Sequence, residues 1–254
     1  MPTSEDETGP IYRVIADKLR KSIITGELVD GQRVPGENEL MRRYGVARAT
    51  ARQALRTLID EGIVTPVRGS GNFVRSFRPV RRHAPKRLSA ELWGRGRPIW
   101  DADAGDRTVE VDNVSVREVR PPEHVARALD LPESATTVRR QRRYLVDNRP
   151  LQLATSYLPA ELARGDGAVL TAVDTGPGGI YARLDELGSA PAHFTEELRV
   201  RMPGPHEAEA LSLAPGTPVI EVVRTALTAH QQAVELNEMV LDGSAHVLAY
   251  DFDA

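Results

Sequence analysis

Hydrophobic residues recur at helical spacing through the first quarter of the chain. From Ile11 to Thr25 an apolar side chain returns about every four positions, and Gly26 ends the run. Two shorter amphipathic runs follow, at residues 37–44 and about 48–60. Gly45 stands between them and can adopt the positive φ that ends one helix and turns the chain. The pattern predicts three helices, the last two forming a helix-turn-helix.

Short β-type runs come directly after the helices. Gly62–Val64 and Phe73–Val74 flank a basic, glycine-rich bend at Arg68–Asn72, which predicts a hairpin, or wing. Glycines such as Gly69 let backbone N–H groups approach a phosphate, and Arg68 can enter a minor groove. An inert hairpin is the alternative, but a basic tip beside a second helix of this kind favours DNA contact.

The helix at 48–60 has two faces of different character. Its core face carries Ala51, Leu55, Leu58 and Ile59. The opposite side, at its N-terminal end, carries Arg48, Ala49, Thr50, Arg52 and Gln53. A recognition helix meets base edges with its N-terminal residues, where Arg can bind guanine through two hydrogen bonds. The arginines could instead form only a solvated face, but the turn and the wing favour a winged helix-turn-helix.

Charge divides the chain. Residues 10–87 hold 17 Lys and Arg against 7 Asp and Glu, whereas residues 88–254 hold 16 against 26. The whole chain has a net charge of −3. A basic module on an acidic body is typical of a protein whose first part alone contacts phosphate.

The same divisions predict the domain organisation. Residues 1–9 are acidic and polar, which predicts a disordered tail rather than a signal peptide. Residues 10–76 form the DNA-binding domain. The basic, Pro-punctuated segment 77–87 is interpreted as a linker near the DNA backbone, and residues 88–254 form a second domain.

Composition limits the possible chemistry. The chain has no Cys and no apolar run approaching the ~20 residues that span a bilayer. Its six His are scattered, and no catalytic triad, metal-spaced His pair or phosphate loop is present. We therefore expect a cytoplasmic protein without catalytic residues, metal, cofactor or membrane partner.

The second domain contains an internal repeat. Shifted by 82 residues, His124–Leu131 lies over His206–Leu213, with His, two Ala and two Leu coinciding. Each copy predicts a short helix and then two strands, at 138–146 and 151–158 or at 219–228 and 234–241. The repeat predicts one long antiparallel sheet built from two related halves.

Strand alternation sorts the side chains of this sheet. Arg140, Arg142 and Tyr144 share one face, and Arg142 and Arg224 occupy equivalent places in the two copies. With Glu235, which falls where Leu153 lies in the first copy, they could line a pocket. Cross-strand ion pairs on an open surface are the alternative, and the residues alone do not choose between the two.

Two family resemblances are carried by these motifs. Residues 10–76 resemble the DNA-binding domain of GntR-type bacterial repressors in the sequences Pro35–Leu40, Gly45–Leu55 and Arg68–Val74. The second domain resembles the UTRA effector domain of the HutC-like subfamily, in Arg142, Asp147–Pro150, Ser156–Pro159 and Ala233–Glu235. The implied fold is α+β, a winged helix-turn-helix followed by an antiparallel-sheet domain similar to chorismate lyase.

The resemblance also implies function. A member of this family is expected to be a homodimer that binds a palindromic operator in double-stranded DNA and responds to a small-molecule effector. A ligand-independent repressor, such as a plasmid-transfer control protein whose second domain only dimerises, is the alternative. By position, the family's DNA contacts fall on Asn38, Arg48, Ala49, Thr50, Arg52 and Gly69. Effector contacts are expected from Ser89, Arg142, Tyr144 and Glu235.

Some positions depart from the family pattern. Ala47 replaces a helix-capping Ser, and Tyr144 replaces the second arginine of an Arg-x-Arg pair that holds sugar phosphates. A phenol removes a bidentate anion clamp and adds a stacking surface. The hypothesis is a ligand less anionic than a sugar phosphate and partly aromatic.

Overall fold

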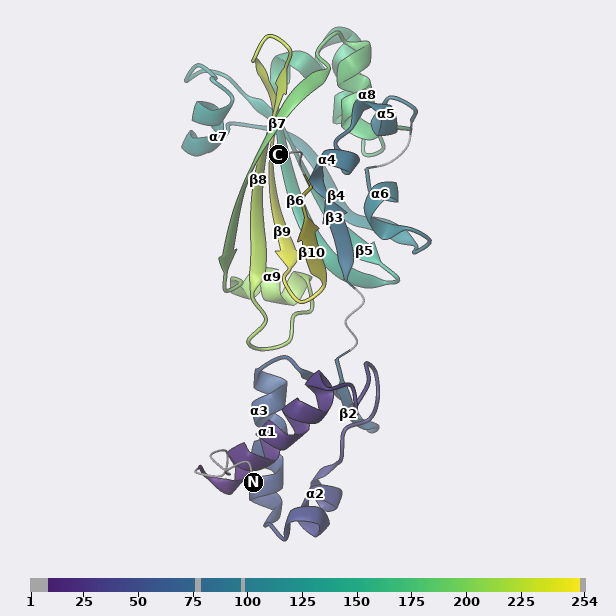
Figure 1. The fold of residues 1–254 in the computed structure, drawn as a ribbon. Helices are drawn as coiled ribbons and strands as arrows, with labels where there is room; N and C mark the ends of the chain where they lie inside the picture. The colour runs from purple at the N-terminus through teal and green to yellow at the C-terminus, as the bar shows by residue number, and fades with distance from the viewer. Residues whose placement is uncertain (1–8, 76–78, 97–98, 252–254) are drawn as a thin grey trace. The chain divides into compact units, whose positions relative to one another are not determined.

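A computed structural model describes residues 9–75, 79–96 and 99–251, and it separates the chain into two compact units (Figure 1). The first unit holds the chain up to Arg78 together with Leu213–Thr217. The second holds Pro79–Ser212 and Pro218–Ala254. Most of the predicted acidic tail lies outside the described residues.

The first unit is a winged helix-turn-helix, as the apolar spacing predicted. Its elements are α1 (Ile11–Ile24), α2 (Glu37–Tyr44), α3 (Arg48–Asp60), β1 (Val64–Val67) and β2 (Gly71–Val74). Fully buried Ile15, Leu40 and Leu58 place one apolar side chain from each helix in a common core. The two strands pair antiparallel. Toward the bend, β1 extends three residues and β2 two residues further than expected, and Pro66 is tolerated because the sheet has only two strands.

The turn between α2 and α3 depends on one glycine. Gly45 has φ 64° and ψ 32°, the left-handed conformation, and its N–H donates to the carbonyl of Met41. The next helix begins after Ala47, whose backbone is extended like that of a capping residue but whose side chain offers no oxygen. The α3 N-terminus therefore lacks a side-chain cap.

The second unit is built on a six-stranded antiparallel sheet. Its strand order is β4-β5-β6-β9-β8-β7, so β4 and β7 lie on opposite edges, and β6 and β9 lie side by side at the centre. The strands are β4 (Val109–Val119), β5 (Thr137–Val146), β6 (Arg149–Pro159), β7 (Pro191–Arg201), β8 (Val219–Thr228) and β9 (Ala233–Asp242).

This sheet consists of two related halves, which confirms the interpretation of the repeat. A shift of 82 residues carries β4 onto β7, β5 onto β8, and α7 (Glu123–Ala128) onto α9 (Pro205–Ala210). Asp130 and Ser212, also 82 apart, follow these helices with φ 49° and 51°. The halves meet where β6 pairs with β9.

Shorter elements surround the sheet. These are β3 (Val80–His83), α4 (Ala84–Arg87), α5 (Ala90–Trp93), α6 (Asp101–Ala104), η1 (Ala160–Ala163), η2 (Gly165–Thr171), α8 (Gly179–Glu186) and β10 (His246–Ala249). Figure 1 shows α4, α5, α6 and α8 together beside the sheet. None of the helices in the described ranges is long and apolar enough to cross a membrane.

The linker expected at 77–87 differs from what the structure shows. Residues 80–87 form β3 and α4, and β3 pairs in parallel with β10 at the other end of the chain. Arg82 and Arg87, which suggested an exposed basic segment, are 1% and 2% exposed. Their carboxylate partners, Glu196 for Arg82 and Asp103 for Arg87, lie outside this segment, so its composition could not reveal that the two arginines are buried.

We expect Ala47→Ser to stabilise the first unit. A Ser oxygen at this position can accept an N–H of the first turn of α3, worth about 1 kcal/mol. Chemical denaturation of the full chain should show the increase. Ala49→Ser, inside the same turn, is the matched control and should give no gain; equal gains from both would contradict the capping explanation.

We also expect a pH dependence from His246. This residue of β10 is buried, and burial lowers its pKa to about 4 from 6.5. The unfolded chain then binds more protons between these two pKa values, so stability is complete above pH 6.5 and falls as the pH decreases. Between about pH 7 and about pH 5 the loss should be about 2 kcal/mol.

The unfolding free energies of the wild type and of His246→Asn should therefore differ in their slope against pH. Groups that titrate in both proteins cancel in this comparison. Parallel pH profiles would contradict the assignment.

Candidate functional site

The N-terminal end of α3 presents two exposed arginines. The side chains of Arg48 and Arg52 are 60% and 66% exposed. Both are held from α2: Arg48 Nη2 donates to Asn38 Oδ1 at 3.0 Å, and Arg52 Nε donates to Glu37 Oε1 at 2.8 Å. Glu37 also lies 3.3 Å from Arg48 Nε, so one carboxylate orients both guanidinium groups.

Sequence reasoning gave Glu37 no role. The hydrogen bond from Arg52 lowers the pKa of Glu37, which keeps this carboxylate charged. A guanidinium has five N–H donors, so each arginine keeps donors for a base or phosphate while Glu37 restricts its rotamers. The preorganisation follows from the crossing of two helices, which side-chain periodicity within one helix does not reveal.

The wing combines two glycines of positive φ with an additional arginine. Arg68 and Gly69 are exposed at the bend, and Gly69 has φ +78°. At Gly71, φ is +115° and an added Cβ would lie 3.0 Å from Nε of Arg33. Arg33, which bridges to Phe73 of β2, therefore places a second basic side chain against the wing.

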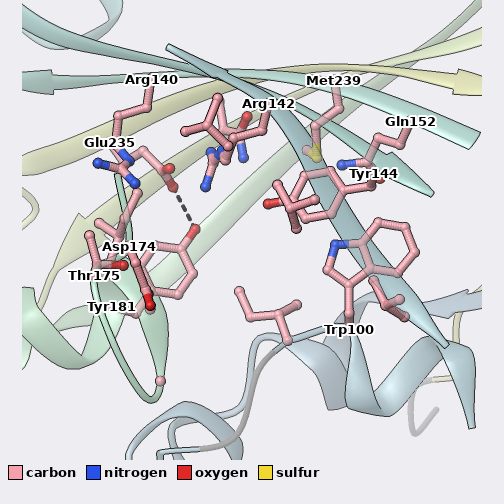
Figure 2. A pocket seen from close by; sticks show the side chains of 18 of the residues that line it. Trp100, Arg140, Arg142, Tyr144, Gln152, Asp174, Thr175, Tyr181, Glu235 and Met239 are labelled. Atoms are coloured by element: carbon pink, nitrogen blue, oxygen red, sulfur yellow. Dashed lines mark hydrogen bonds between the residues drawn. The ribbon is translucent and has the colours of Figure 1, made fainter. Parts of the chain in front are cut away.

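One face of the sheet in the second unit borders a cavity of about 510 Å³ (Figure 2). Strand alternation brings Arg140, Arg142 and Tyr144 of β5 to this cavity, and Glu235 of β9 joins them. The cavity is also lined by α8, by the segment before it and by Trp100. Its other lining residues include Arg87, Gln152, Asp174, Thr175, Tyr181, Arg224, Asn237 and Met239.

Arg140 is committed to the backbone of the segment before α8. Its Nη1 donates to the carbonyls of Leu170 and Ala172, and its Nη2 to that of Val173 at 3.1 Å. Burial lowers the pKa of Arg140 to about 10, so it remains charged at neutral pH. It fixes the chain that presents Asp174 to the cavity.

Glu235 and Arg224 lie at the same end of the cavity. The hydroxyl of Tyr181 donates to Glu235 Oε2 at 2.6 Å, and Arg224 Nη2 lies 3.7 Å from the same oxygen. Burial raises the pKa of Tyr181 well above its ordinary value, which keeps the phenol protonated as a donor. Arg224 is only 4% exposed, so a nearby carboxylate is required to compensate its charge.

Further buried ion pairs lie next to Arg224 and Glu235. Arg82 Nη1 donates to Glu196 Oε2 at 2.9 Å, and Glu196 lies 4.0 Å from Arg224. Arg87 Nε lies 2.9 Å from Asp103, and both side chains are at most 3% exposed. Burial lowers the pKa of Arg87 to about 10, so Arg87 keeps its charge at neutral pH, and burial raises the pKa of Asp103.

The other end of the cavity is aromatic. Tyr144 and Trp100 stack with ring centroids 5.0 Å apart and an interplanar angle of 29°. Gln152 and Met239 lie beside them, and Figure 2 shows Arg142 between this end and the Glu235–Tyr181 end. Arg142 lies over the Tyr144 ring at 5.9 Å and donates to Ser156 Oγ.

Comparisons with known proteins agree with this architecture. Residues 11–74 match the family model of the bacterial regulatory proteins, gntR family, and residues 104–246 match the UTRA domain. An uncharacterized HTH-type transcriptional regulator of Streptomyces coelicolor is 32% identical over 249 residues, covering 96% of this chain and 93% of the relative. The chain belongs to the gntR family.

More distant relatives extend the same pattern. The HTH-type transcriptional repressor NagR of Bacillus subtilis is 26% identical over 248 residues, covering 96% of this chain and 95% of NagR. A crystal structure of a GntR-family transcriptional regulator shares the fold with a TM-score of 0.64 and 24% identity, covering 98% of this chain and 99% of that one. This GntR-family chain is therefore a DNA-binding transcriptional regulator with a UTRA domain.

The structure places the expected effector residues unequally. Arg142, Tyr144 and Glu235 line the cavity of the UTRA domain. Ser89 is not among the described residues that line it. Its side chain instead caps α5 by accepting the N–H of Glu91. Sequence reasoning missed Trp100 and Tyr181, which lie outside the repeated strands and carry no periodic signal.

One equivalence between the two repeats needs correction. Arg142 pairs with Ala154 across β5 and β6, whereas Arg224 pairs with Asn237 across β8 and β9. The second strand of each half is thus offset by 83 residues rather than 82, and Glu235 takes the place of Gln152 instead of Leu153. A one-residue shift changes the face of a strand, so both Gln152 and Glu235 point to the cavity.

We expect Arg140→Gln to loosen the segment before α8. Loss of the three backbone hydrogen bonds should raise amide hydrogen exchange at residues 171–176 by about tenfold or more, since charged hydrogen bonds contribute about 1.5–3 kcal/mol each. Mass-spectrometric exchange of the full chain measures this directly. Arg139→Gln, the neighbour on the opposite face, is the control; equal exchange in both variants would contradict the anchoring role.

Proposed function

We propose that this GntR-family regulator is a homodimeric repressor that binds a palindromic operator and responds to a small molecule in the UTRA cavity. Two geometric features support the proposal. The recognition helix presents its N-terminal arginines in a fixed orientation, and the second domain contains a cavity lined by unsatisfied polar groups.

The DNA contacts are assigned to seven residues. On this proposal Arg48 and Arg52 contact base edges, Asn38, Ala49 and Thr50 lie beside them, and Arg68 with Gly69 contacts the backbone or minor groove. All of these except half-buried Thr50 are exposed. A dimer would place two such surfaces about one helical turn of DNA apart, matching a palindrome.

Effector binding rests on the content of the cavity. Among the residues that the structure describes, Arg142 Nε, Arg224 Nη1, Gln152 Oε1 and Asn237 Oδ1 are buried without a hydrogen-bond partner. Unpaired buried polar atoms cost stability, and a ligand with complementary groups would remove that cost. This observation favours a ligand-responsive regulator over the ligand-independent repressor, because side chains would fill the cavity in a second domain that serves only dimerisation.

The remaining expectations follow the same proposal. We assign the chain no catalytic residue, metal or cofactor, and a bacterial cytoplasmic location where operator DNA is accessible. Ligand can change operator affinity only to the extent that it binds two states of the dimer with different affinity.

Footprinting on the DNA upstream of its own gene, titrated with cell extract, tests the proposal as a whole. We expect protection of a short palindrome that the extract weakens or strengthens. Protection that does not respond to extract would favour the ligand-independent alternative. Absence of a protected palindrome would contradict the operator model.

We expect Arg52→Ala to reduce operator affinity by roughly 10- to 100-fold, the effect of losing a bidentate base contact. Arg56→Ala is the matched control, since Arg56 is on the same helix, is 73% exposed and lies one turn further along. Gel-shift titrations at fixed salt measure both. Equal losses from the two substitutions would indicate only a general charge effect.

A further inference from the structure

We propose that the effector is a monoanionic acid with a flat ring, whose acid group binds Arg142 and whose ring packs against Tyr144. This inference rests on the proposed function and specifies the chemistry of its ligand. Three observations carry it: the charge balance of the cavity, a difference between the two repeats, and the aromatic end with its unpaired amide.

The charge balance leaves one positive charge for the ligand. Three buried arginines are compensated by three carboxylates. Arg82 pairs with Glu196, Arg87 pairs with Asp103, and Arg224 lies near both Glu235 and Glu196. The cavity lining then contains two further cations, Arg140 and Arg142, against one carboxylate, Asp174. A single negative charge on the ligand would neutralise the site.

The internal repeat identifies the arginine of the cavity that has no carboxylate partner among the described residues. Arg142 and Arg224 are equivalent, and the corresponding positions on the adjacent strands are Gln152 and Glu235. Arg224 has the carboxylate of Glu235 at 3.7 Å, whereas the residue in that role for Arg142 is a neutral amide. Since Arg140 is occupied by three backbone carbonyls, Arg142 is the cation available to an acid group.

The same repeat marks the ring site. The register places Tyr144 opposite Gln152 and Ala226 opposite Glu235, so an aromatic residue of the first half replaces a small residue of the second. Tyr144 is backed by Trp100, which fixes its plane. A rigid aromatic wall favours a flat ring over a puckered one, because a flat ring makes contact over its whole face.

Gln152 adds a polar requirement at this end. It is 3% exposed, and its Oε1 has no hydrogen-bond partner. A donor on the ring edge, such as a ring N–H, would satisfy this oxygen. The cavity volume of about 510 Å³ accommodates an acid group and a bicyclic ring together.

Isothermal titration calorimetry on the full-length protein tests the proposal with three probes. Indole-3-propanoate carries one negative charge, a flat ring and a ring N–H. 3-Cyclohexylpropanoate has the same charge and a puckered ring without a donor, and glucose 6-phosphate is a dianion without a flat ring. We expect the indole acid to bind at least about tenfold more tightly than either of the others, equivalent to about 1.4 kcal/mol.

Substitutions assign the preference to residues. Tyr144→Leu should remove the tenfold preference for the indole acid, and Tyr144→Phe, which retains the ring, should preserve it. Arg142→Gln should weaken both carboxylates by a similar factor. Circular dichroism and operator binding of each variant, compared with the wild type, verify folding.

Several results would overturn the ligand class. These are tighter binding of glucose 6-phosphate, equal binding of the two carboxylates, a preference that survives Tyr144→Leu, or indole-acid binding weaker than about 10 mM. Failure of the proposed function looks different. If cell extract changes the footprint while these acids do not bind, the proposed effector response stands and the ligand class is wrong. If the indole acid binds as expected but the extract leaves the footprint unchanged, the ligand class stands and the proposed effector response is wrong.

Discussion

Compensation of buried guanidinium groups is the constraint on which the UTRA domain depends. Arg82, Arg87 and Arg224 are each at most 4% exposed, and an isolated charge at such depth would cost several kcal/mol. Their partners come from separate parts of the chain: Asp103 from α6, Glu196 from β7 and Glu235 from β9. Satisfying these pairs fixes β3 and α4 against the sheet and determines one wall of the cavity.

The first unit depends on a different kind of constraint. Its core consists of apolar residues repeated at helical spacing, and Gly45 supplies the one backbone conformation that the turn requires. Both signals are local, so the sequence predicted the three helices and the wing closely. The contact of Glu37 with Arg48 and Arg52 joins two helices through side chains, and only the structure reveals it.

In the second unit the repeat predicted the sheet, while details of register and burial escaped prediction. The 82-residue shift located the related strands, but the one-residue difference in the second hairpin moved Glu235 onto the place of Gln152. Residues 80–87 show no periodic pattern that would predict a strand. Their strand β3 pairs with β10 near the other end of the chain, and this partner is not visible in the local sequence. Trp100 likewise reaches the cavity through tertiary packing, which no local pattern encodes.

The site arises where the two halves stop being equivalent. A perfect repeat would present two identical arginines across the junction of β6 and β9, each with the same neighbours. In this chain Glu235, which accepts a hydrogen bond from the hydroxyl of Tyr181, compensates one arginine, while the other lies beside neutral Gln152 and Tyr144. One half thus supplies an arginine whose charge is compensated within the protein, and the other supplies an arginine that has no carboxylate partner among the described residues. Asymmetry imposed on a duplicated scaffold therefore gives the two ends of the cavity different chemistry, one end with a compensated ion pair and the other with a cation beside an aromatic wall.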